Sequence, residues 1–261
     1  MSDLELSIKD GVALARLNRP EKKNALSPDM LLALKQGLEA AQDDPDVRVF
    51  VITGAGNAFC SGGDLGRRAS EGEPTPLDRK NRLQQGTHKV ALAIEAFDKP
   101  LIAAVNGAAA GAGMDMACMC DLRFAARSAR FSEAYIRVGL IPGNAGCYFL
   151  PRVVGPAKAL EMLWTGDFVD ADEALRIGLV NRVYDDDKLM EETLAFAGRL
   201  ASGPPLQQRL IKKLMYQSLR TDLKTSREMV SSHMAVVQST SDYREAIQAY
   251  KEKRKPKYEG R

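Results

Sequence analysis

Two stretches of small residues, each directly after a buried strand pattern, constrain most strongly how this chain can fold. The stretch GAGNAFCSGGDL follows the apolar run at residues 47–53, and NGAAAGAGMD follows the apolar run at residues 101–105. Short apolar runs of this kind are typical of buried strands. A backbone without large side chains can come into contact with another segment or with a ligand. Because α/β proteins bind ligands where strands end, the two stretches predict an α/β fold with a site beside them.

The remaining patterns predict strands first and helices last. Residues 4–8 and 12–17 alternate around Asp10-Gly11, which is a hairpin signal, and Ser27-Pro28 begins a helix that runs to about Asp43. Residues 66–86 are polar and contain two prolines, so we expect a loop there. Further strands are expected at 122–125, 131–136 and 179–184. Helical periodicity is found at 88–97, 156–165, 171–177, 187–202, 205–219, 222–237 and 242–253. This order favours a βα core with a helical C-terminal appendage.

The composition argues against several classes of protein. With 261 residues, of which 45% are hydrophobic, the chain is long enough for a large globular core. Its formal net charge of +3 suits an anionic small molecule, but the dense Lys/Arg blocks of a nucleic-acid binder are missing. No apolar run approaches the ~18 residues of a membrane span. The first residues show no signal or transit pattern. We therefore expect no nucleic-acid partner, no membrane partner and a cytoplasmic location.

The cysteines and glycines predict neither a metal site nor a nucleotide cradle. Cys118 and Cys120 lack the spacing and the second pair of a zinc site, and together with Cys60 and Cys147 they are expected to be buried free thiols. Neither glycine-rich stretch has the Gly-Lys-Ser/Thr ending of a phosphate loop or the spacing of the dinucleotide fingerprint. The sequence thus predicts no metal and no separate cofactor.

Two glycine-rich turns together can bind an oxyanion, which a single turn rarely does. One such turn is most simply explained by tight packing of a strand on a helix. Two turns, CSGGD and GAAAGAGMD, could each direct a backbone N–H to the same point. That arrangement is an oxyanion hole, which stabilises the oxyanion formed from a thioester carbonyl. Packing and oxyanion binding both remain open at this stage.

Segments spread over nearly the whole chain resemble the crotonase (enoyl-CoA hydratase/isomerase) superfamily. They are NRPEKKNAL, AFCSGGDL, KPLIAAVNGAAAGAGMDMACMCD, FSEAYIRVGLIPGNAG, ADEALRIGLVNRV and DYREAIQAYKEKRKPKY. The resemblance implies an α/β fold with a crotonase-like spiral of ββα units over residues 1–200, which binds acyl-CoA. It also implies a C-terminal helical trimerisation region over residues 201–261, and a homotrimer or homohexamer. The oxyanion hole would be formed by the N–H groups of Gly63 and Ala112. Coenzyme A enters as part of the substrate and not as a cofactor.

The resemblance also assigns contacts with the coenzyme A part of the substrate. The segment PEKKNAL is similar to the family's clamp on the nucleotide and pantetheine. The turn from Ser61 to Asp64 is similar to the part that holds the adenine. The residues concerned are Lys22, Lys23, Ala25 and Leu26 in the clamp and Ser61 and Asp64 in the turn. Lys22 and Lys23 could instead be an ordinary solvated charge pair.

Two residues of the last predicted helix match positions that, in the family, reach the coenzyme A of a neighbouring subunit. They are Tyr250 and Lys253. The resemblance therefore implies that the substrate site is completed by a second copy of the chain. As an alternative, Tyr250 could belong to the core of its own helix.

The acid/base positions depart from the family pattern. Hydratases of the family use two carboxylates, and here Asp115 occupies the first position while Tyr135 occupies the second. Some isomerases use an Asp in a GLIPD motif, where this chain has Gly143 followed by Asn144. Glu133 shares the expected strand parity of Tyr135 and could point the same way. Asp115, Glu133, Tyr135 and Asn144 are therefore the candidate catalytic residues.

The leading hypothesis is an acyl-CoA enzyme of enoyl-CoA hydratase type, with Asp115 as the acid/base. An enoyl-CoA isomerase or an acyl-CoA thioester hydrolase with one carboxylate is the alternative within the same fold. A non-catalytic acyl-CoA-binding scaffold is the alternative of another class. Glu133 could also pair with Arg137, in which case Tyr135 would only fill the acyl pocket.

The sequence does not identify the acyl chain. We expect the chain to be selected by residues 66–97 and by the surroundings of Phe149 and Trp164. His88, at the start of an expected helix, is more simply interpreted as exposed than as facing the acyl pocket.

Overall fold

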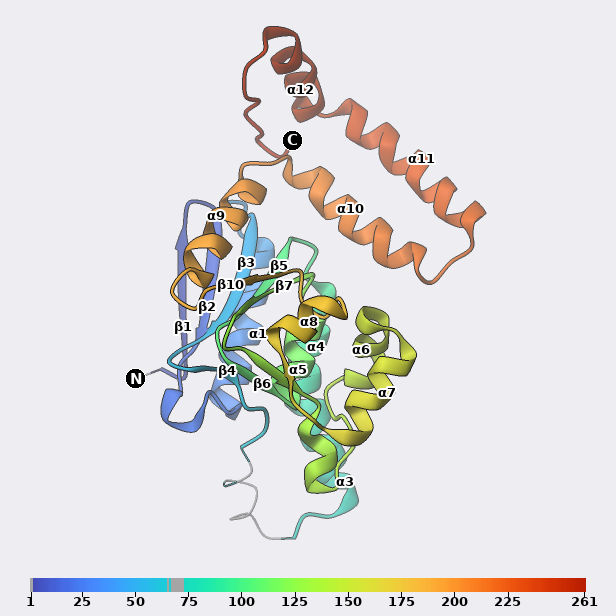
Figure 1. Ribbon diagram of the computed structural model, residues 1–261. Helices are drawn as coiled ribbons and strands as arrows, with labels where there is room; N and C mark the ends of the chain where they lie inside the picture. Colours follow the sequence, from blue (N-terminus) through green and yellow to red (C-terminus); the bar gives the residue numbers. More distant parts are fainter. Residues whose placement is uncertain (1, 65, 67–72) are drawn as a thin grey trace.

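Between residues 49 and 132, successive strands alternate between two sheets in the computed structural model of the protein (Figure 1), which describes residues 2–64, 66 and 73–261. The larger sheet has the strand order β1 (Leu4–Lys9), β2 (Val12–Leu17), β3 (Val49–Gly54), β5 (Leu101–Val105), β7 (Leu122–Ala126) and β10 (Arg182–Tyr184). The smaller sheet has the order β4 (Ala58–Cys60), β6 (Ala108–Ala110), β8 (Arg130–Ser132) and β9 (Val169–Asp170). In the pairs β3–β4, β5–β6 and β7–β8 the chain passes from the larger sheet to the smaller one. This confirms the expected α/β spiral.

Helices follow the strand pairs and continue to the end of the chain. In the first two thirds they are α1 (Pro28–Asp43), α3 (Pro76–Gln85), α4 (Thr87–Ala96), α5 (Ala112–Met119), α6 (Gly146–Val154), α7 (Pro156–Thr165) and α8 (Ala171–Arg176), with short 3-10 helices η1 (Pro20–Lys22) and η2 (Ala134–Val138). The C-terminal third contains α9 (Leu189–Ala201), α10 (Pro205–Ser218), α11 (Leu223–Ser239) and α12 (Ser241–Glu252). α9 packs on the larger sheet, where the rings of Phe196 and Phe124 meet edge to face at 5.1 Å between centroids.

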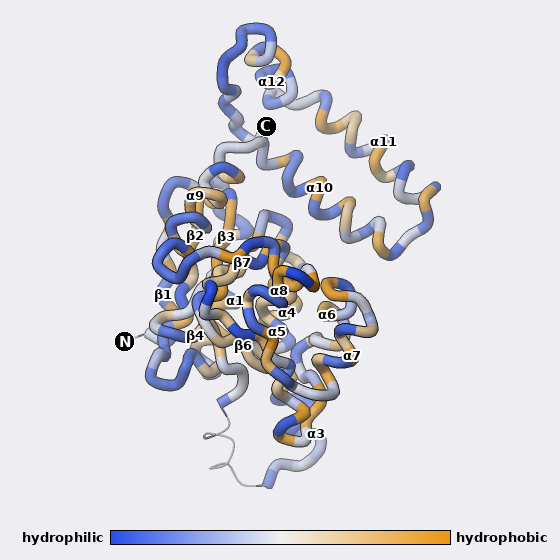
Figure 2. Tube along the Cα trace, in the orientation of Figure 1, coloured by the Kyte–Doolittle hydropathy of each residue, from blue (hydrophilic) through white to orange (hydrophobic). Residues whose placement is uncertain are grey.

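The hydrophobic core lies around the parallel strands of the larger sheet. All residues of β3 and β5 are buried, because helices cover these central strands and both of their faces must be apolar. Figure 2 shows these strands in hydrophobic colours, whereas the loops around them are hydrophilic. The strand patterns that end in glycines are therefore core elements, and their ends hold the glycine-rich turns in fixed positions.

The glycine-rich stretches are themselves partly strands, since β4 and β6 lie within them. A side chain on Gly107 would overlap the carbonyl oxygen of Asn57, and one on Gly113 would overlap that of Cys60. These two glycines are thus required by the close approach of neighbouring main chain. The packing explanation for the small residues holds at these positions, whatever the turns bind.

Two local expectations are wrong, and one helix was not expected. The polar segment 66–86 was expected to be a loop, and its residues 67–72 lie outside the described residues. α3 forms at the end of this segment because Thr75 and Asp78 make a capping box and Pro76 occupies the first turn. The strand expected over 131–136 ends at Ser132 and continues as η2. The sequence pattern also missed α6.

The helices α10 to α12 project from the body of the molecule (Figure 1). Neither α10 nor α11 contains a buried residue, and Figure 2 shows hydrophobic positions recurring between hydrophilic ones along both. In the described part of the chain, no helix has the length and apolarity that crossing a membrane requires.

The cysteines are free, as expected, but one is not buried. Cys60, Cys118 and Cys120 lie in the core, and burial raises the pKa of the Cys60 thiol to about 12. Cys147 is exposed at the start of α6, which corrects the expectation for this residue.

Candidate active site

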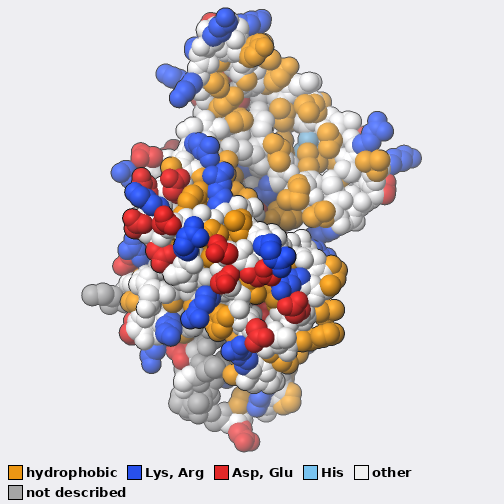
Figure 3. All heavy atoms as spheres, viewed as in Figure 1, with side chains coloured by type: hydrophobic (Ala, Val, Ile, Leu, Met, Phe, Trp, Pro, Cys, Tyr) orange, Lys and Arg blue, Asp and Glu red, His pale blue; other side chains and the backbone are white. Residues whose placement is uncertain are grey.

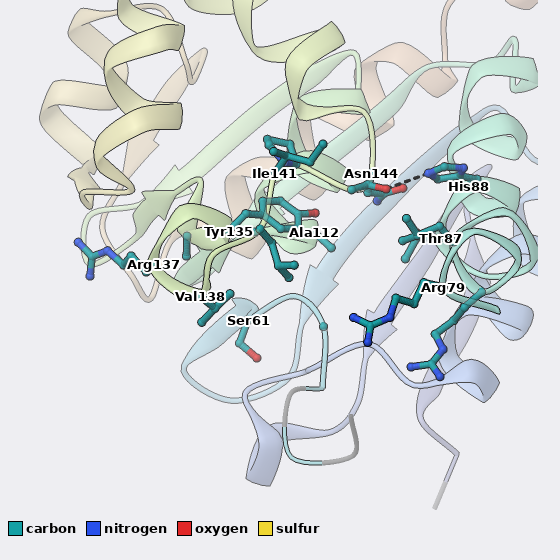
Figure 4. A pocket seen from close by; sticks show the side chains of 18 of the residues that line it. Ser61, Arg79, Thr87, His88, Ala112, Tyr135, Arg137, Val138, Ile141 and Asn144 are labelled. Carbon is teal, nitrogen blue, oxygen red and sulfur yellow. Dashed lines mark hydrogen bonds between the residues drawn. The ribbon is translucent and has the colours of Figure 1, made fainter. Parts of the chain in front are cut away.

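A cavity of about 740 Å³ opens where the two glycine-rich turns meet η2 and the helices α3 and α4 (Figure 4). Ser61 and Gly63 line it from the turn after β4, and Ala112 lines it from the start of α5. The opposite wall is apolar and includes Leu83 and Ile141. The site therefore lies where strands of the smaller sheet end, as expected for an α/β fold.

The two expected oxyanion donors lie on the same cavity wall. A side chain on Gly62, which has φ of +89°, would lie only 3.1 Å from the nitrogen of Ala112, so the two turns are in contact. Ala112 is the first residue of α5, and the N–H of such a residue has no acceptor within its own helix. Gly111 before it has φ of +51°, which favours glycine. Gly63 and Ala112 are thus placed where two N–H groups could serve one oxygen.

The predicted clamp is bonded directly to the first of these turns. The Ser61 N–H donates to the carbonyl of Lys23 over 3.0 Å, and the Leu26 N–H donates to the carbonyl of Gly62 over 2.8 Å. Lys22 and Lys23 are exposed, so their ammonium groups are accessible to a phosphate.

Two other residues of this region carry structural contacts. Arg19 donates to the Ala25 carbonyl over 2.7 Å and forms an ion pair with Asp64 at 3.2 Å. Arg19 therefore holds the clamp and the turn together. Tyr250, which is 85% exposed, lies on α12, and Lys253 directly follows this helix. α12 is on the far side of the molecule from α3 (Figure 1). Tyr250 and Lys253 do not reach the cavity of their own chain.

Tyr135 lines the cavity, and two buried carboxyl groups lie behind it. The Tyr135 hydroxyl donates a hydrogen bond of 2.6 Å to Oδ2 of Asp115. Asp115 and Glu133 both have an exposed fraction of 0%. A side chain on Gly146 would overlap Oδ1 of Asp115 and lie 3.2 Å from Oε1 of Glu133, so both carboxyl groups face the same bare backbone. The start of α6 thus makes room for the pair.

Burial shifts the pKa values of this group upward. Burial raises the pKa of Asp115 to about 7, although the hydrogen bond from Tyr135 opposes the shift. Burial and then the neighbouring Asp115 raise the pKa of Glu133 to about 9. Burial also raises the pKa of Tyr135 above its usual range. Burial therefore favours the protonated form of both carboxyl groups, and the hydrogen bond from Tyr135 makes Asp115 the one that ionises more readily.

Comparison with known proteins identifies the family. Residues 7–261 match the family described as enoyl-CoA hydratase/isomerase. The chain belongs to this family. It is 37% identical over 254 residues to the crotonyl-CoA hydratase of Syntrophomonas wolfei, covering 97% of this chain and 96% of that one. It is 33% identical to the 1,2-epoxyphenylacetyl-CoA isomerase of Escherichia coli, with 97% of each chain covered.

A solved structure of an enoyl-CoA hydratase from Bacillus anthracis has the same fold. Its TM-score is 0.94 at 33% identity, and the match covers 99% of this chain and 100% of that one. Family membership confirms an acyl-CoA enzyme of enoyl-CoA hydratase type, which was the leading hypothesis from the sequence.

Within this family site, the proposed pairing of Glu133 with Arg137 is wrong. Arg137 forms an ion pair with Asp167 at 3.0 Å, whereas Glu133 is buried beside Asp115. The parity argument that grouped Glu133 with Tyr135 also fails, because Tyr135 belongs to a 3-10 helix and not to a strand. The side chains of Glu133 and Tyr135 nevertheless both lie next to Asp115.

The cavity is lined by only part of the surroundings expected to select the acyl chain: residues between 73 and 88 of the expected segment 66–97 line it. Trp164 is 70% exposed, and neither it nor Phe149 lines the described part of the cavity. His88 does line the cavity, and its Nε2 lies 2.8 Å from the carbonyl oxygen of Gly143, opposite the expectation of an exposed side chain (Figure 4). No sequence motif indicated this contact, which joins residues 55 positions apart in the chain.

Two polar atoms of the cavity lack partners among the described residues. They are Oγ1 of Thr87, which the sequence analysis missed, and Oδ1 of Asn144, which lay among the candidates. A buried acceptor without a partner costs stability unless water or a ligand satisfies it. The cavity therefore offers sites for polar groups beside its apolar wall.

Proposed function

We propose that this chain adds water across the double bond of a 2-enoyl-CoA thioester. The observation that carries the proposal is the meeting of two glycine-rich turns at one cavity wall, directly in front of a buried aspartate. The N–H groups of Gly63 and Ala112 would hold the thioester oxygen. Asp115 would provide the acid/base function.

In this reaction the oxygen of water bonds to the β-carbon, and one of its protons passes to the enzyme. The electron pair of the double bond moves to the thioester oxygen, which becomes an enolate in the oxyanion hole. The same proton then returns to the α-carbon, and the thioester carbonyl re-forms. One group that ionises near neutral pH can perform both transfers, which fits the raised pKa of Asp115.

Asn144 favours hydration over the alternative reactions. Its unpartnered Oδ1 can accept a hydrogen bond from the attacking water, but an amide cannot remove a proton from carbon. Isomerisation remains the second candidate, since a relative of similar identity is named as an isomerase. Thioester hydrolysis and non-catalytic acyl-CoA binding complete the alternatives.

For the substrate's coenzyme A, we propose the contacts expected from the family. Lys22, Lys23 and the main chain of Ala25 and Leu26 would hold the phosphates and pantetheine, with the turn from Ser61 to Asp64 beside the adenine. Tyr250 and Lys253 would reach the coenzyme A of a neighbouring subunit in a cytoplasmic homotrimer or homohexamer. Their distance from the cavity of their own chain supports this assignment.

The decisive test removes one oxyanion donor. Proline is tolerated at the first position of a helix, so Ala112→Pro deletes the N–H with little effect on α5. We expect turnover of crotonyl-CoA to fall about 10²-fold or more, as when one oxyanion donor is lost. Ala112→Gly keeps the N–H and is the control. Turnover by the folded proline variant at the control's rate would contradict the assignment.

A further inference from the structure

Of the hydrogen-bonded residues Tyr135 and Asp115, only Tyr135 lies at the surface of the cavity. Among the described residues that line the cavity, Tyr135 is present and Asp115 is absent. Asp115 has no exposed surface at all. A substrate in the cavity therefore meets the phenol first, and the carboxyl group lies one hydrogen bond of 2.6 Å behind it.

The tyrosine ring is held beside the oxyanion donors. A side chain on Gly111 would lie 3.7 Å from the ring, and one on Gly143 would lie 3.9 Å from it. The ring is thus packed between the residue before Ala112 and the loop that carries Asn144. Figure 4 shows Tyr135 next to Ala112, with Asn144 on the same side. The ring therefore lies beside the proposed oxyanion donor Ala112, and its hydroxyl is bonded to Asp115.

We propose that the Tyr135 hydroxyl transfers protons between the acyl-CoA substrate and the buried Asp115 carboxylate. This inference rests on the proposed function and names the group that touches the reacting atoms. Tyr135 is then the catalytic residue, and Asp115 acts through it as the residue that stores the proton.

The transfer balances in both directions. As water bonds to the β-carbon, its proton moves to the Tyr135 oxygen while the phenolic proton moves to Oδ2 of Asp115. In the second step the phenolic proton moves to the α-carbon while Asp115 returns its proton to Tyr135. The product carries the elements of one water molecule, and the enzyme regains its starting state. No tyrosinate accumulates, in accordance with a phenol whose pKa is raised by burial.

Among the charged and titratable groups around this relay, Asp115 is the one that can take the proton from Tyr135. Glu133 beside it holds its own proton near neutral pH. Cys118 of α5 has a pKa raised by burial, and Cys147 of α6 also has a raised pKa. His88 of α4 is bonded to the Gly143 carbonyl, and the Arg123 guanidinium of β7 is bonded to main-chain carbonyls including that of Cys120. None of these groups is the hydrogen-bond partner of Tyr135.

The test compares two tyrosines that have the same kind of partner. Tyr135→Phe removes the hydroxyl in the cavity. Tyr216→Phe removes a hydroxyl that donates to Asp121 over 3.0 Å and lies outside the cavity. For each variant we would measure crotonyl-CoA hydration, and the exchange of the α-hydrogens of butyryl-CoA with D₂O by mass spectrometry. Exchange needs only the enolate and the proton relay, so it separates the relay from hydration.

We expect Tyr135→Phe to lower kcat about 10²-fold or more, the usual contribution of a group that transfers protons, while KM stays within about threefold. Tyr216→Phe should behave as the unchanged chain. Asp115→Asn should cost about as much as Tyr135→Phe, and the double variant little more, because both residues serve one path. The acidic limb of the pH profile of the residual activity should shift to higher pH in Tyr135→Phe, since the lost hydrogen bond had lowered the pKa of Asp115.

The outcomes separate the relay from the hydratase assignment. If the unchanged chain exchanges α-hydrogens but does not hydrate, and Tyr135→Phe loses the exchange, the hydratase proposal fails and the relay stands. If Tyr135→Phe keeps both reactions within about threefold, the relay is overturned. A folded chain that performs neither reaction would overturn both.

Discussion

At the scale of single residues, the two buried carboxyl groups make the folded chain sensitive to pH. Glu133 has an ordinary pKa when unfolded, whereas in the folded chain burial raises it to about 9. Between these values the folded chain binds the proton more tightly than the unfolded chain does. The contribution of Glu133 to the stability of the folded chain is therefore greatest below the pKa of the unfolded chain, and it is lost as the pH rises towards the pKa of the folded chain.

Glu133→Gln should remove this loss. The amide keeps the shape of a protonated carboxyl group but cannot ionise, so the variant should gain stability relative to the unchanged chain as the pH rises. For one proton, the difference in unfolding free energy grows by at most about 1.4 kcal/mol per pH unit. Thermal unfolding at several values between about pH 5 and pH 9 measures it. A difference in Tm that stays constant over this range would show that Glu133 does not titrate with a raised pKa.

Single residues also differ in how well the sequence predicts them. The positions of Gly63 and Ala112 at one cavity and of Asp115 behind it could be predicted from motifs, because each lies in or next to a glycine-rich turn, while their roles stay predictions. The meeting of Glu133 with Asp115 does not follow from any motif. It depends on Gly146, which belongs to a helix that the sequence pattern missed, and on the 3-10 turn that redirects the chain after Ser132.

At the scale of elements, the position of the proposed oxyanion hole depends on how closely α5 approaches β4. Gly113 lies in the first turn of α5, directly against the carbonyl group of Cys60 at the end of β4. The backbone cannot yield easily there, since β4 is paired in the smaller sheet. The small residues thus set the distance between the two turns, and through it the geometry of the N–H pair.

Gly113→Ala should therefore reduce turnover without removing any functional group. The added methyl group must push α5 away from β4, which misplaces the Ala112 N–H and strains the contact. We expect kcat to fall about tenfold or more and Tm to decrease. Gly198→Ala in α9 is the matched control, because no atom lies within 4 Å of the added methyl group. There, alanine should leave turnover unchanged and stabilise the helix slightly. Equal turnover in the two variants would show that the approach of α5 to β4 is not critical.

Elements with a clear apolar pattern were predicted well, and elements without one were not. The strands β1, β2 and β5 and the helices α9 to α12 lie close to their expected ranges, because apolar residues either recur in them with the period of a strand or helix or form a continuous run. α3 has only two large apolar residues, Leu77 and Leu83, so its capping box is its clearest sequence signal. The 3-10 helix η2 is ended by Gly139 in the left-handed region, a turn whose position apolar periodicity does not reveal.

At the scale of the whole molecule, the helices α10 to α12 form an arm that a single chain leaves uncovered. Large hydrophobic side chains are exposed along it, including Ile211 at 66%, Leu219 at 67% and Leu223 at 75%. Figure 3 shows hydrophobic side chains gathered over the visible face of these helices. Apolar surface of this extent marks an interaction site. The family resemblance implies that second and third copies of the chain cover it.

We therefore expect light scattering to give about three or six times the 28.5 kDa mass of one chain. Leu219→Asp and Leu223→Asp place charges at the turn between α10 and α11, and burying an unpaired charge in an interface is costly. Each should shift the mass towards that of the monomer at micromolar concentration. Leu77→Asp is the control, because Leu77 is similarly exposed at 62% but lies on α3, away from the arm. A monomer in the unchanged chain would contradict the assembly, and so would an oligomer weakened by the α3 substitution alone. If Tyr250 and Lys253 complete a neighbour's site, the arm variants should also raise KM for the acyl-CoA, because dissociation removes those contacts together with the interface.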